Sequence, residues 1–464
     1  MNDKILNSLF VQNPWWLGES LSFPATQRQL FPILQTAIDS ARITAVVGMR
    51  RVGKTTLFIQ LIQQLLKRGV EAKSILYFSA DAVEFQTITH PIKESFDLYR
   101  EQIAPKQKKL YLFIDEAHFA PDWALELKNI WDRYQPKIFI TGSSALFILK
   151  NSRESLTGRI QTFHLPPLSF REFIELRGIS LEISELSLPT RIEGKSLIDF
   201  AEEIAVRPLF LEKWRRTLYP QWQEYLVRGG FPEGLKVLDQ REFYRLIRED
   251  IIDRVLFKDV PQLFAVGDRR LLYDLFLYSI YNSGELFSYH SLAQNFKTKV
   301  HTVSNYLTYL SSARLLLISE KYSGSFEGIK KANKKLYVAD IGIRNAFLRI
   351  HAVSELHREV LGKMVETVAV SRAHYLAQAH EGHVFYWRNR GEVDLVFRIG
   401  TNVIPVEIKY RSQLDQADLR GLAQFAKTFD AGNGILVTEN VTGVKQVNGI
   451  KIGLLPIWVM LLLE

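Results

Sequence analysis

Short apolar runs alternate with longer amphipathic stretches through the first third of the chain. Residues 54–68 repeat apolar side chains at helical spacing, with Leu57, Leu61 and Leu65 on one side. The apolar runs are short and apolar on both faces, and they cover residues 43–47, 75–78, 110–114 and 138–140. Such runs, when helices separate them, are typical of parallel strands that are covered on both sides. The pattern therefore predicts an α/β fold around a parallel sheet.

The pattern of apolar and polar residues changes after Pro166-Pro167. Strand signals become few there, and helical periodicity dominates up to about residue 319. From Leu336 onward strands and helices alternate again, and residues 393–410 have the pattern of a hairpin. We therefore predict four domains, which span residues 1–165, 166–235, 236–335 and 336–464.

Composition limits the class of protein. The 464 residues are 47% hydrophobic and 23% charged, which is ordinary for globular proteins and excludes a collagen-like or disordered chain. Cysteine is absent from the sequence, so disulfides, thiolate zinc sites and cysteine nucleophiles are excluded. The apolar run at residues 452–463 contains Pro456 and is too short for a membrane span. Since the first residues also lack the apolar block of a signal peptide, we expect a soluble, cytoplasmic protein with no membrane partner.

A phosphate-binding loop follows the first predicted strand. The segment from Gly48 to Thr55 matches the pattern GxxxxGK[ST], directly after a buried strand and at the start of a helix. Backbone N–H groups of such a loop surround phosphates, Lys54 would reach the β- and γ-phosphates, and the Thr55 hydroxyl would hold Mg²⁺. The residues predicted to bind ATP are Gly48, Arg50, Arg51, Val52, Gly53, Lys54, Thr55 and Thr56.

Two adjacent carboxylates end the strand predicted at residues 110–114. Asp115 would orient Mg²⁺, and Glu116 would polarise the attacking water as the catalytic base. Together with the loop and Lys54, this pair predicts hydrolysis of a nucleoside triphosphate, with ATP and Mg²⁺ as cofactors. In residues 141–144, which end the next apolar run, Ser143 is a candidate for contact with the γ-phosphate. An ordinary turn with a serine cap explains that segment equally well.

The predicted hairpin brings carboxylates together. If Gly400-Thr401 forms its turn, Asp394 lies opposite Glu407, and Lys409 shares the face of Glu407. Opposed carboxylates repel one another unless a cation lies between them, and a divalent metal together with Lys409 would supply that charge. A salt-bridged hairpin surface is the alternative interpretation.

A winged helix is predicted at residues 286–335. Residues 289–296 and 303–310 read as two short helices, and a strand and a basic loop at residues 321–335 follow. Eight Lys and Arg residues stand against two Glu between positions 297 and 335, a surplus of six within a chain of net charge +9. Such clustering favours contact with a nucleic-acid backbone, although a winged helix can also bind protein. The expected contacts are Lys330, Lys331, Lys334 and Lys335.

These motifs resemble a bacterial and archaeal group of AAA+-type P-loop ATPases whose C-terminal half is a domain of unknown function. The motifs that carry the resemblance, besides the loop and Asp115-Glu116, are Asn13-Pro14-Trp15-Trp16, Thr141-Gly142-Ser143-Ser144, Leu156-Thr157-Gly158-Arg159, residues 165–173, Gly229-Gly230-Phe231-Pro232 and residues 337–342. For the four predicted domains the resemblance implies an ATPase core, a helical lid, a winged helix and a nuclease-like domain, in that order. It also favours Arg159 over Arg153 as the residue that reaches the nucleotide of a neighbouring subunit in a homo-oligomer.

The terminal domain resembles the PD-(D/E)XK nuclease superfamily through Asp394, Glu407 and Lys409, although no proline precedes Asp394. The resemblance implies a restriction-endonuclease-like α/β domain in which both carboxylates bind Mg²⁺ and the lysine helps to position the nucleophile. Glu366, in the helical stretch at residues 362–376, matches the glutamate that such enzymes often add to the metal site.

The sequence as a whole predicts an Mg-dependent AAA+-type ATPase coupled to a DNA-binding, nuclease-like C-terminal half. Two other functions stay open at this point. One is a switch-type signalling ATPase whose C-terminal modules bind a protein and cleave no nucleic acid. The other keeps ATP binding but treats the nuclease fold as inert.

Overall fold

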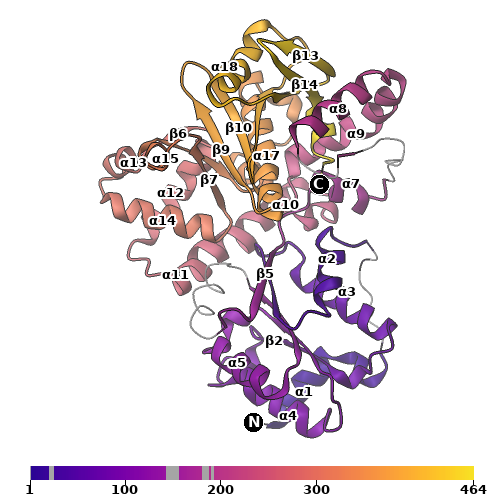
Figure 1. Cartoon of the computed structure of the whole chain (residues 1–464). Coiled ribbons are helices and arrows are strands. Elements are labelled where there is room, and N and C mark those ends of the chain that lie inside the picture. The colour runs from indigo at the N-terminus through magenta and orange to yellow at the C-terminus, as the bar shows by residue number, and fades with distance from the viewer. Residues whose placement is uncertain are drawn as a thin grey trace. The chain divides into compact units, whose positions relative to one another are not determined.

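The computed structural model describes residues 2–19, 24, 26–142, 156–179, 188–189 and 193–463. The chain divides into two compact units, and the division lies between Pro166 and Pro167. We call them the N-terminal unit and the C-terminal unit (Figure 1).

The N-terminal unit is built on a five-stranded sheet with the order β2-β3-β4-β1-β5. Every pairing in it is parallel, so the predicted parallel α/β sheet is confirmed. The strands are β1 (Ile43–Val47), β2 (Ile75–Ser79), β3 (Tyr111–Asp115), β4 (Lys137–Gly142) and β5 (Ile160–His164). The helices are α1 (Asn2–Gln12), α2 (Leu30–Ala37), α3 (Lys54–Lys67), α4 (Pro91–Gln102) and α5 (Trp123–Tyr134). Strands β1, β3 and β4 are buried along their whole length, as their continuous apolar sequence predicts.

The C-terminal unit contains a nine-stranded mixed sheet with the order β13-β14-β12-β11-β10-β9-β7-β8-β6. Its strands are β6 (Leu286–Phe287), β7 (Leu316–Lys321), β8 (Lys334–Val338), β9 (His383–Arg388), β10 (Glu392–Ile399), β11 (Asn402–Lys409), β12 (Asn433–Thr438), β13 (Gly443–Val447) and β14 (Ile450–Pro456). In the β10–β11 hairpin Ile399 pairs with Asn402, so the predicted register is confirmed.

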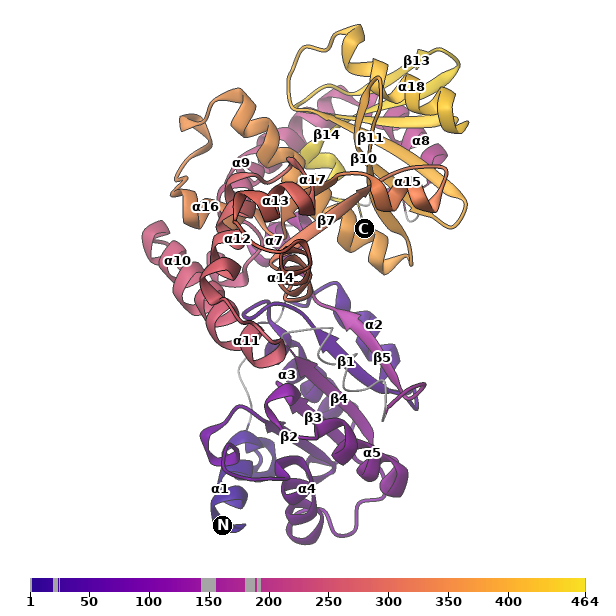
Figure 2. The same cartoon turned by 90° about the vertical axis from the view of Figure 1, so that its left-hand side faces the viewer.

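Helices precede, separate and follow the strands of this unit. They are α7 (Phe170–Leu176), α8 (Gly194–Ala205), α9 (Pro208–Arg228), α10 (Gln240–Leu246), α11 (Val260–Leu263), α12 (Arg269–Tyr281), α13 (Tyr289–Asn295), α14 (Val300–Ser312), α15 (Phe326–Lys331), α16 (Ile341–Leu348), α17 (Arg358–Ala379), α18 (Arg420–Phe429) and α19 (Ile457–Met460). Helix α8, in the region expected to form a lid, packs on β12 and β14. Figure 1 shows α8 near β14, and Figure 2 shows the same unit turned by 90°. Its Leu197, Ile198 and Ala201 share one apolar core with α17 and the sheet.

The region expected to be a winged helix contributes strands to this same sheet. Helices α13 and α14 are the two predicted helices, and β7 pairs antiparallel with β8. Strand β7 also pairs in parallel with β9, where Glu320 lies opposite Phe385, so the sheet continues from β8 through β7 into the hairpin. The domain boundary predicted at residue 335 lies inside β8.

Residues 321–335 differ from the expected basic loop. They contain helix α15, and Lys334 and Lys335 already belong to β8, which is buried along its whole length. The apolar side chains that follow Lys335 are the reason, since Leu336, Tyr337 and Val338 pair with β7 in the interior. The apolar C-terminal run likewise ends in the short helix α19 after β14. Within the described residues we find no helix with the length and apolar character of a membrane span.

Candidate functional site

The phosphate-binding loop connects β1 to α3. Gly53 precedes α3 with φ 98°, a left-handed conformation that glycine adopts without steric cost. Gly48 lies against the chain after β5, where an added Cβ would be 2.3 Å from the carbonyl oxygen of Leu165. Arg51 also has a positive φ of 62°, which is uncommon for a residue with a side chain. The loop is thus held in a conformation that both glycines make accessible.

Lys54 is 4% exposed and points back into the loop. Its Nζ donates to the carbonyl oxygens of Gly48 and Met49, each 3.1 Å away, and lies 3.3 Å from Oε1 of Glu116. Burial alone would raise the pKa of Glu116, but the charges of Lys54 and His118 hold it below its usual value. The sequence therefore predicted a lysine and a carboxylate that the fold does bring together.

Glu116 follows β3 in a left-handed conformation with φ 47°, and its backbone N–H donates to the Thr141 hydroxyl at 2.8 Å. Its other carboxylate oxygen, Oε2, lies 3.3 Å from Nδ1 of the buried His118. Unusual backbone geometry in a non-glycine residue costs free energy and recurs at functional sites. Sequence reasoning missed His118, although its place two residues after Glu116 was the available signal.

Asp115 is buried and receives three side-chain hydroxyls. Thr55 Oγ1 donates to Asp115 Oδ2 at 2.5 Å, Tyr77 Oη donates to the same oxygen at 2.9 Å, and Thr141 donates to Oδ1. Burial and the neighbouring Glu116 raise the pKa of Asp115. Thr55 and Asp115, the predicted Mg²⁺ ligands, are in direct contact. Tyr77 was missed because its strand, β2, carries no motif.

Arg28 is a third residue that the sequence did not single out. Its guanidinium donates to the carbonyl oxygen of Val52 in the loop at 2.6 Å and to that of Pro166 at 2.7 Å. Val52 is fully buried, while Arg50 and Thr56 are half-buried beside the loop. Buried carbonyl groups need hydrogen-bond donors, and Arg28 supplies one to Val52 and one to Pro166.

Arg159 does not lie at the phosphate-binding loop of its own chain. It precedes β5, and its carbonyl accepts from Ile43 at the start of β1, whereas the loop follows the other end of that strand. Its side chain lies 3.3 Å from Asp132 and over the ring of Trp131. A role for Arg159 toward a neighbouring copy stays a prediction. Ser143 and Arg153 lie outside the described residues.

The second predicted site lies on the β10–β11 hairpin. Asp394 and Glu407 are opposed as the register requires: Asp394 N–H donates to Glu407 Oε2 at 3.2 Å, and Asp394 Oδ2 accepts from Ile408 N–H at 3.0 Å. Lys409 Nζ lies 2.5 Å from Glu407 Oε1. Both carboxylates are buried, and burial together with Asp394 raises the pKa of Glu407 well above its usual value. The fold brings these three predicted residues together.

Glu366 of α17 joins this cluster through Lys335 of β8. Lys335 Nζ lies 2.9 Å from Glu366 Oε1, 2.9 Å from Glu392 Oε1 and 3.4 Å from Asp394 Oδ1. Burial and the charge of Asp394 raise the pKa of Glu366 to about 7. We call Glu366, Glu392, Asp394 and Glu407, with Lys335 and Lys409, the carboxylate cluster. Sequence reasoning missed Glu392, which stands two residues before Asp394 on the same face of β10.

The four lysines expected on a nucleic-acid surface divide into two pairs. Lys330 and Lys331 of α15 have side chains that are 55% and 81% exposed. Lys334 is 11% exposed beside Glu320, and Lys335 is 4% exposed in the carboxylate cluster. The expected surface role of Lys334 and Lys335 is therefore wrong, because β8 buries both side chains, Lys334 beside the partly exposed Glu320 and Lys335 within the carboxylate cluster.

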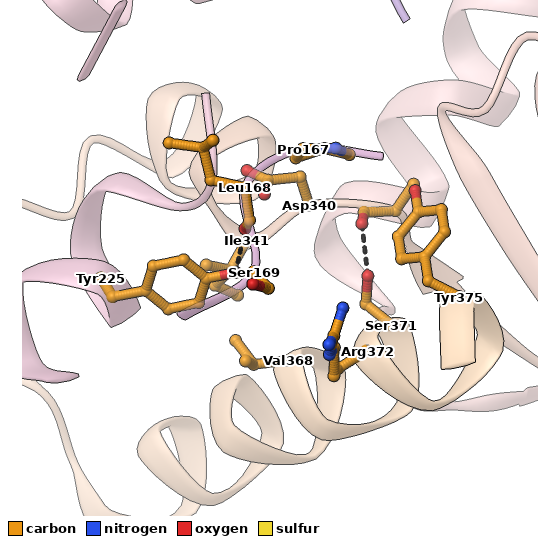
Figure 3. A pocket seen from close by; sticks show the side chains of 11 residues that line it. Pro167, Leu168, Ser169, Tyr225, Asp340, Ile341, Val368, Ser371, Arg372 and Tyr375 are labelled. Atoms are coloured by element: carbon orange, nitrogen blue, oxygen red, sulfur yellow. Dashed lines mark hydrogen bonds between the residues drawn. The ribbon is translucent and has the colours of Figure 1, made fainter. Parts of the chain in front are cut away.

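Asp340, which lines a small cavity, connects two of the sequence motifs that carried the resemblance. Figure 3 shows Asp340 among its lining residues, with the Tyr225 hydroxyl bonded to the Leu168 carbonyl. The carboxylate of Asp340 accepts from Gly230 N–H and Gly342 N–H, each at 2.8 Å. Burial raises the pKa of Asp340 to about 6. These contacts give the two glycine motifs a structural role in joining α9 to α16.

Family models assign the first of these sites to a class of protein. Residues 40–174 match a model described as an AAA domain. Residues 219–354 and 361–458 match two models that are each described as a domain of unknown function. The N-terminal unit, with its parallel sheet and phosphate-binding loop, is therefore an AAA-type P-loop ATPase domain.

Similar proteins are known from several organisms. An uncharacterised protein of Haemophilus influenzae is 22% identical over 427 residues, which are 91% of this chain and 95% of that protein. One from Methanocaldococcus jannaschii is 28% identical over 306 residues, 64% of this chain and 60% of that protein. Among solved structures, the Aeropyrum pernix ORC1 protein in complex with DNA gives a TM-score of 0.31 at 14% identity, covering 72% of this chain and 96% of that chain. The S. cerevisiae Hsp104–ADP complex gives 0.28 at 16% identity, covering 62% and 40%.

Proposed function

We propose that the N-terminal unit binds and hydrolyses ATP with Mg²⁺. The observation that carries the proposal is the direct contact between Thr55 and Asp115, made 2.5 Å apart beside the loop lysine. A hydroxyl and a carboxylate are oxygen donors of the kind that Mg²⁺ prefers, and such sites complete their coordination with phosphates and water. The donor set therefore fits the ion. When bound, Mg²⁺ would neutralise charge on the phosphates.

Three other side chains would bind the phosphates, activate water and position the acidic residues. Lys54 would exchange its two loop carbonyls for phosphate oxygens, since an ammonium binds an anion more strongly than neutral carbonyls. Glu116 is the candidate base that orients and polarises water, and its lowered pKa keeps it ionised. The Thr141 hydroxyl contacts both residues, since it donates to Asp115 Oδ1 and accepts from the backbone N–H of Glu116.

Glu116→Gln should separate nucleotide binding from hydrolysis. We expect ATP turnover to fall at least about a hundredfold, because the amide cannot accept a proton from water. ATP affinity should change little, since Lys54, Thr55 and Asp115 remain. Steady-state phosphate release and binding of a fluorescent ATP analogue measure the two quantities. Glu101→Gln, at an exposed position on α4, is the matched control. Equal ATP turnover in both variants would show that Glu116 is not the catalytic base.

For the C-terminal unit we propose metal-dependent cleavage of a nucleic-acid phosphodiester at the carboxylate cluster. The observation that favours it is the pairing of Asp394 with Glu407, with Lys409 beside them. In this proposal the cluster would act on DNA, and Lys330 and Lys331 would contact the DNA backbone. ATP turnover would drive movement of the C-terminal unit along or around the DNA. The competing function is a switch that binds a protein. Stimulation of ATP turnover by DNA supports the first, and its absence supports the second.

Asp394→Asn should abolish cleavage of DNA in Mg²⁺ or Mn²⁺. We expect a loss of at least about a hundredfold, because the substitution removes a charge from the centre of the cluster while preserving side-chain shape. Gel assays on single- and double-stranded DNA measure it. Asp430→Asn, exposed after α18 in the same unit, is the control. Cleavage at the same rate in both variants would contradict the assignment.

A further inference from the structure

The carboxylate cluster already contains a cation at its centre. Lys335 reaches it from β8 and contacts carboxylates from two other elements, Glu366 on α17 and Glu392 and Asp394 on β10. Its three N···O distances are 2.9, 2.9 and 3.4 Å, and its side chain is 4% exposed. An ammonium has three hydrogens, so it can donate one to each of the three carboxylates.

The other lysine of the cluster occupies a different place. Lys409 contacts Glu407, is 34% exposed, and lies toward solvent. If all groups are ionised, the four carboxylates exceed the two ammonium groups by two negative charges, which is the charge of one divalent cation. Yet among the described residues we find no group of three acidic or histidine side chains positioned to hold a metal ion. As the side chains stand, the ammonium of Lys335 occupies the space between Glu366, Glu392 and Asp394 where a divalent metal would have to lie.

We infer that Lys335 is the resident cation of the carboxylate cluster, and that a divalent metal can bind these carboxylates only after Lys335 withdraws. The inference rests on the proposed function in one respect, since it treats the cluster as a cation-binding site. Buried carboxylates without a cation would be costly, and Lys335 supplies that cation while the metal is absent. A lysine suits this role because its flexible four-carbon stem lets the ammonium move without displacement of the strand.

Removal of the ammonium tests this competition directly. Lys335→Met keeps most of the stem and removes the charge, so we expect nucleotide-free protein to bind Mn²⁺ at least about tenfold more tightly than the wild type. The electron paramagnetic resonance signal of free Mn²⁺ measures the affinity. Adding Asp394→Asn to Lys335→Met should abolish the gain, which locates the new affinity in the cluster. Equal or weaker binding by a folded Lys335→Met protein would overturn the inference.

The neighbouring lysine provides a control of the same charge. Lys334→Met removes an ammonium from the same strand, but Lys334 pairs with Glu320 at 3.2 Å rather than with the cluster. We expect its Mn²⁺ affinity to equal that of the wild type. If both lysine variants gain Mn²⁺ affinity equally, the gain comes from the lower net positive charge of the protein and not from a vacated place in the cluster. The inference would then fail.

A measurement on the wild type keeps the test independent of how the variant folds. Without metal, Lys335 should resist an amine-modifying reagent, because it is buried and held by three carboxylates. At Mn²⁺ concentrations that fill the cluster, mass spectrometry should detect its modification. A Lys335 that stays protected at full occupancy would show that the metal binds beside it, and this result would overturn the inference.

Failure of the inference and failure of the proposed function give different results. If Lys335→Met binds Mn²⁺ more tightly but neither protein cleaves DNA, nuclease activity is excluded and the inference holds. If the wild type cleaves DNA and Lys335→Met binds Mn²⁺ no more tightly, the inference is wrong and the proposed function holds.

Discussion

Replacing Lys54 by alanine should reduce ATP turnover by at least about a hundredfold and weaken ATP binding as well. Lys54 is the buried cation of the loop, and its ammonium lies between the loop carbonyls and Glu116. The substitution removes the positive charge that would offset the charge of the phosphates. Loss of one such preorganised interaction typically lowers the rate by roughly 10²–10³. Phosphate release and equilibrium binding of a labelled nucleotide measure both losses.

The control for this experiment lies on the same helix. Lys67→Ala removes a lysine from the exposed end of α3 and should leave turnover unchanged. Circular dichroism of both variants checks that the fold is intact. A Lys54→Ala protein that is folded and hydrolyses ATP at the wild-type rate would show that the loop does not hold the reacting nucleotide.

Gly229→Ala should unfold the C-terminal unit or destabilise it by about 3 kcal/mol or more. Gly229 ends α9 with φ 72° and ψ −161°, a conformation that is accessible essentially to glycine alone. An added Cβ would lie 2.1 Å from Asp340 Oδ1 and 2.6 Å from the Gly342 nitrogen, closer than atoms in contact can approach. These atoms take part in the buried hydrogen bonds that join α9 to α16. A movement that relieves the clash would therefore break those bonds.

Chemical denaturation, followed by tryptophan fluorescence, measures this loss. The control is Gly267→Ala, because nothing lies within 4 Å of the added Cβ and the backbone there does not have a positive φ. We expect the control to unfold at the wild-type denaturant concentration. If Gly229→Ala matches it, the join between α9 and α16 can adapt, and the structural role assigned to Asp340 is incorrect.

The comparison between sequence and structure shows which features are local. The phosphate-binding loop was predictable because its pattern, strand and helix are contiguous from residue 43 to residue 67. The opposition of Asp394 and Glu407 was predictable because a two-residue turn fixes the register of a hairpin. Both predictions depend on chain geometry over fewer than thirty residues.

Lys335 shows why the rest was not predictable. In the sequence it is one of several basic residues in a row, and nothing local separates it from exposed Lys331. Its burial follows from the pairing of β8 with β7 and from the position of Glu366, thirty-one residues further along the chain. Arg28 and Tyr77 were also missed, because neither belongs to a motif and each acts through a contact with a segment that is distant in sequence.

The contact of Arg28 with both Val52 and Pro166 sets a limit on how the junction between the two units can be altered. On one side, Arg28 ties Pro166 to the phosphate-binding loop. On the other, Leu168 donates to the Gly230 carbonyl at 2.6 Å and accepts from Tyr225. Pro167 is the single residue between these two anchored positions. Within residues 165–169, a flexible linker would therefore separate these two sets of hydrogen bonds without interrupting either one only if it were inserted beside Pro167.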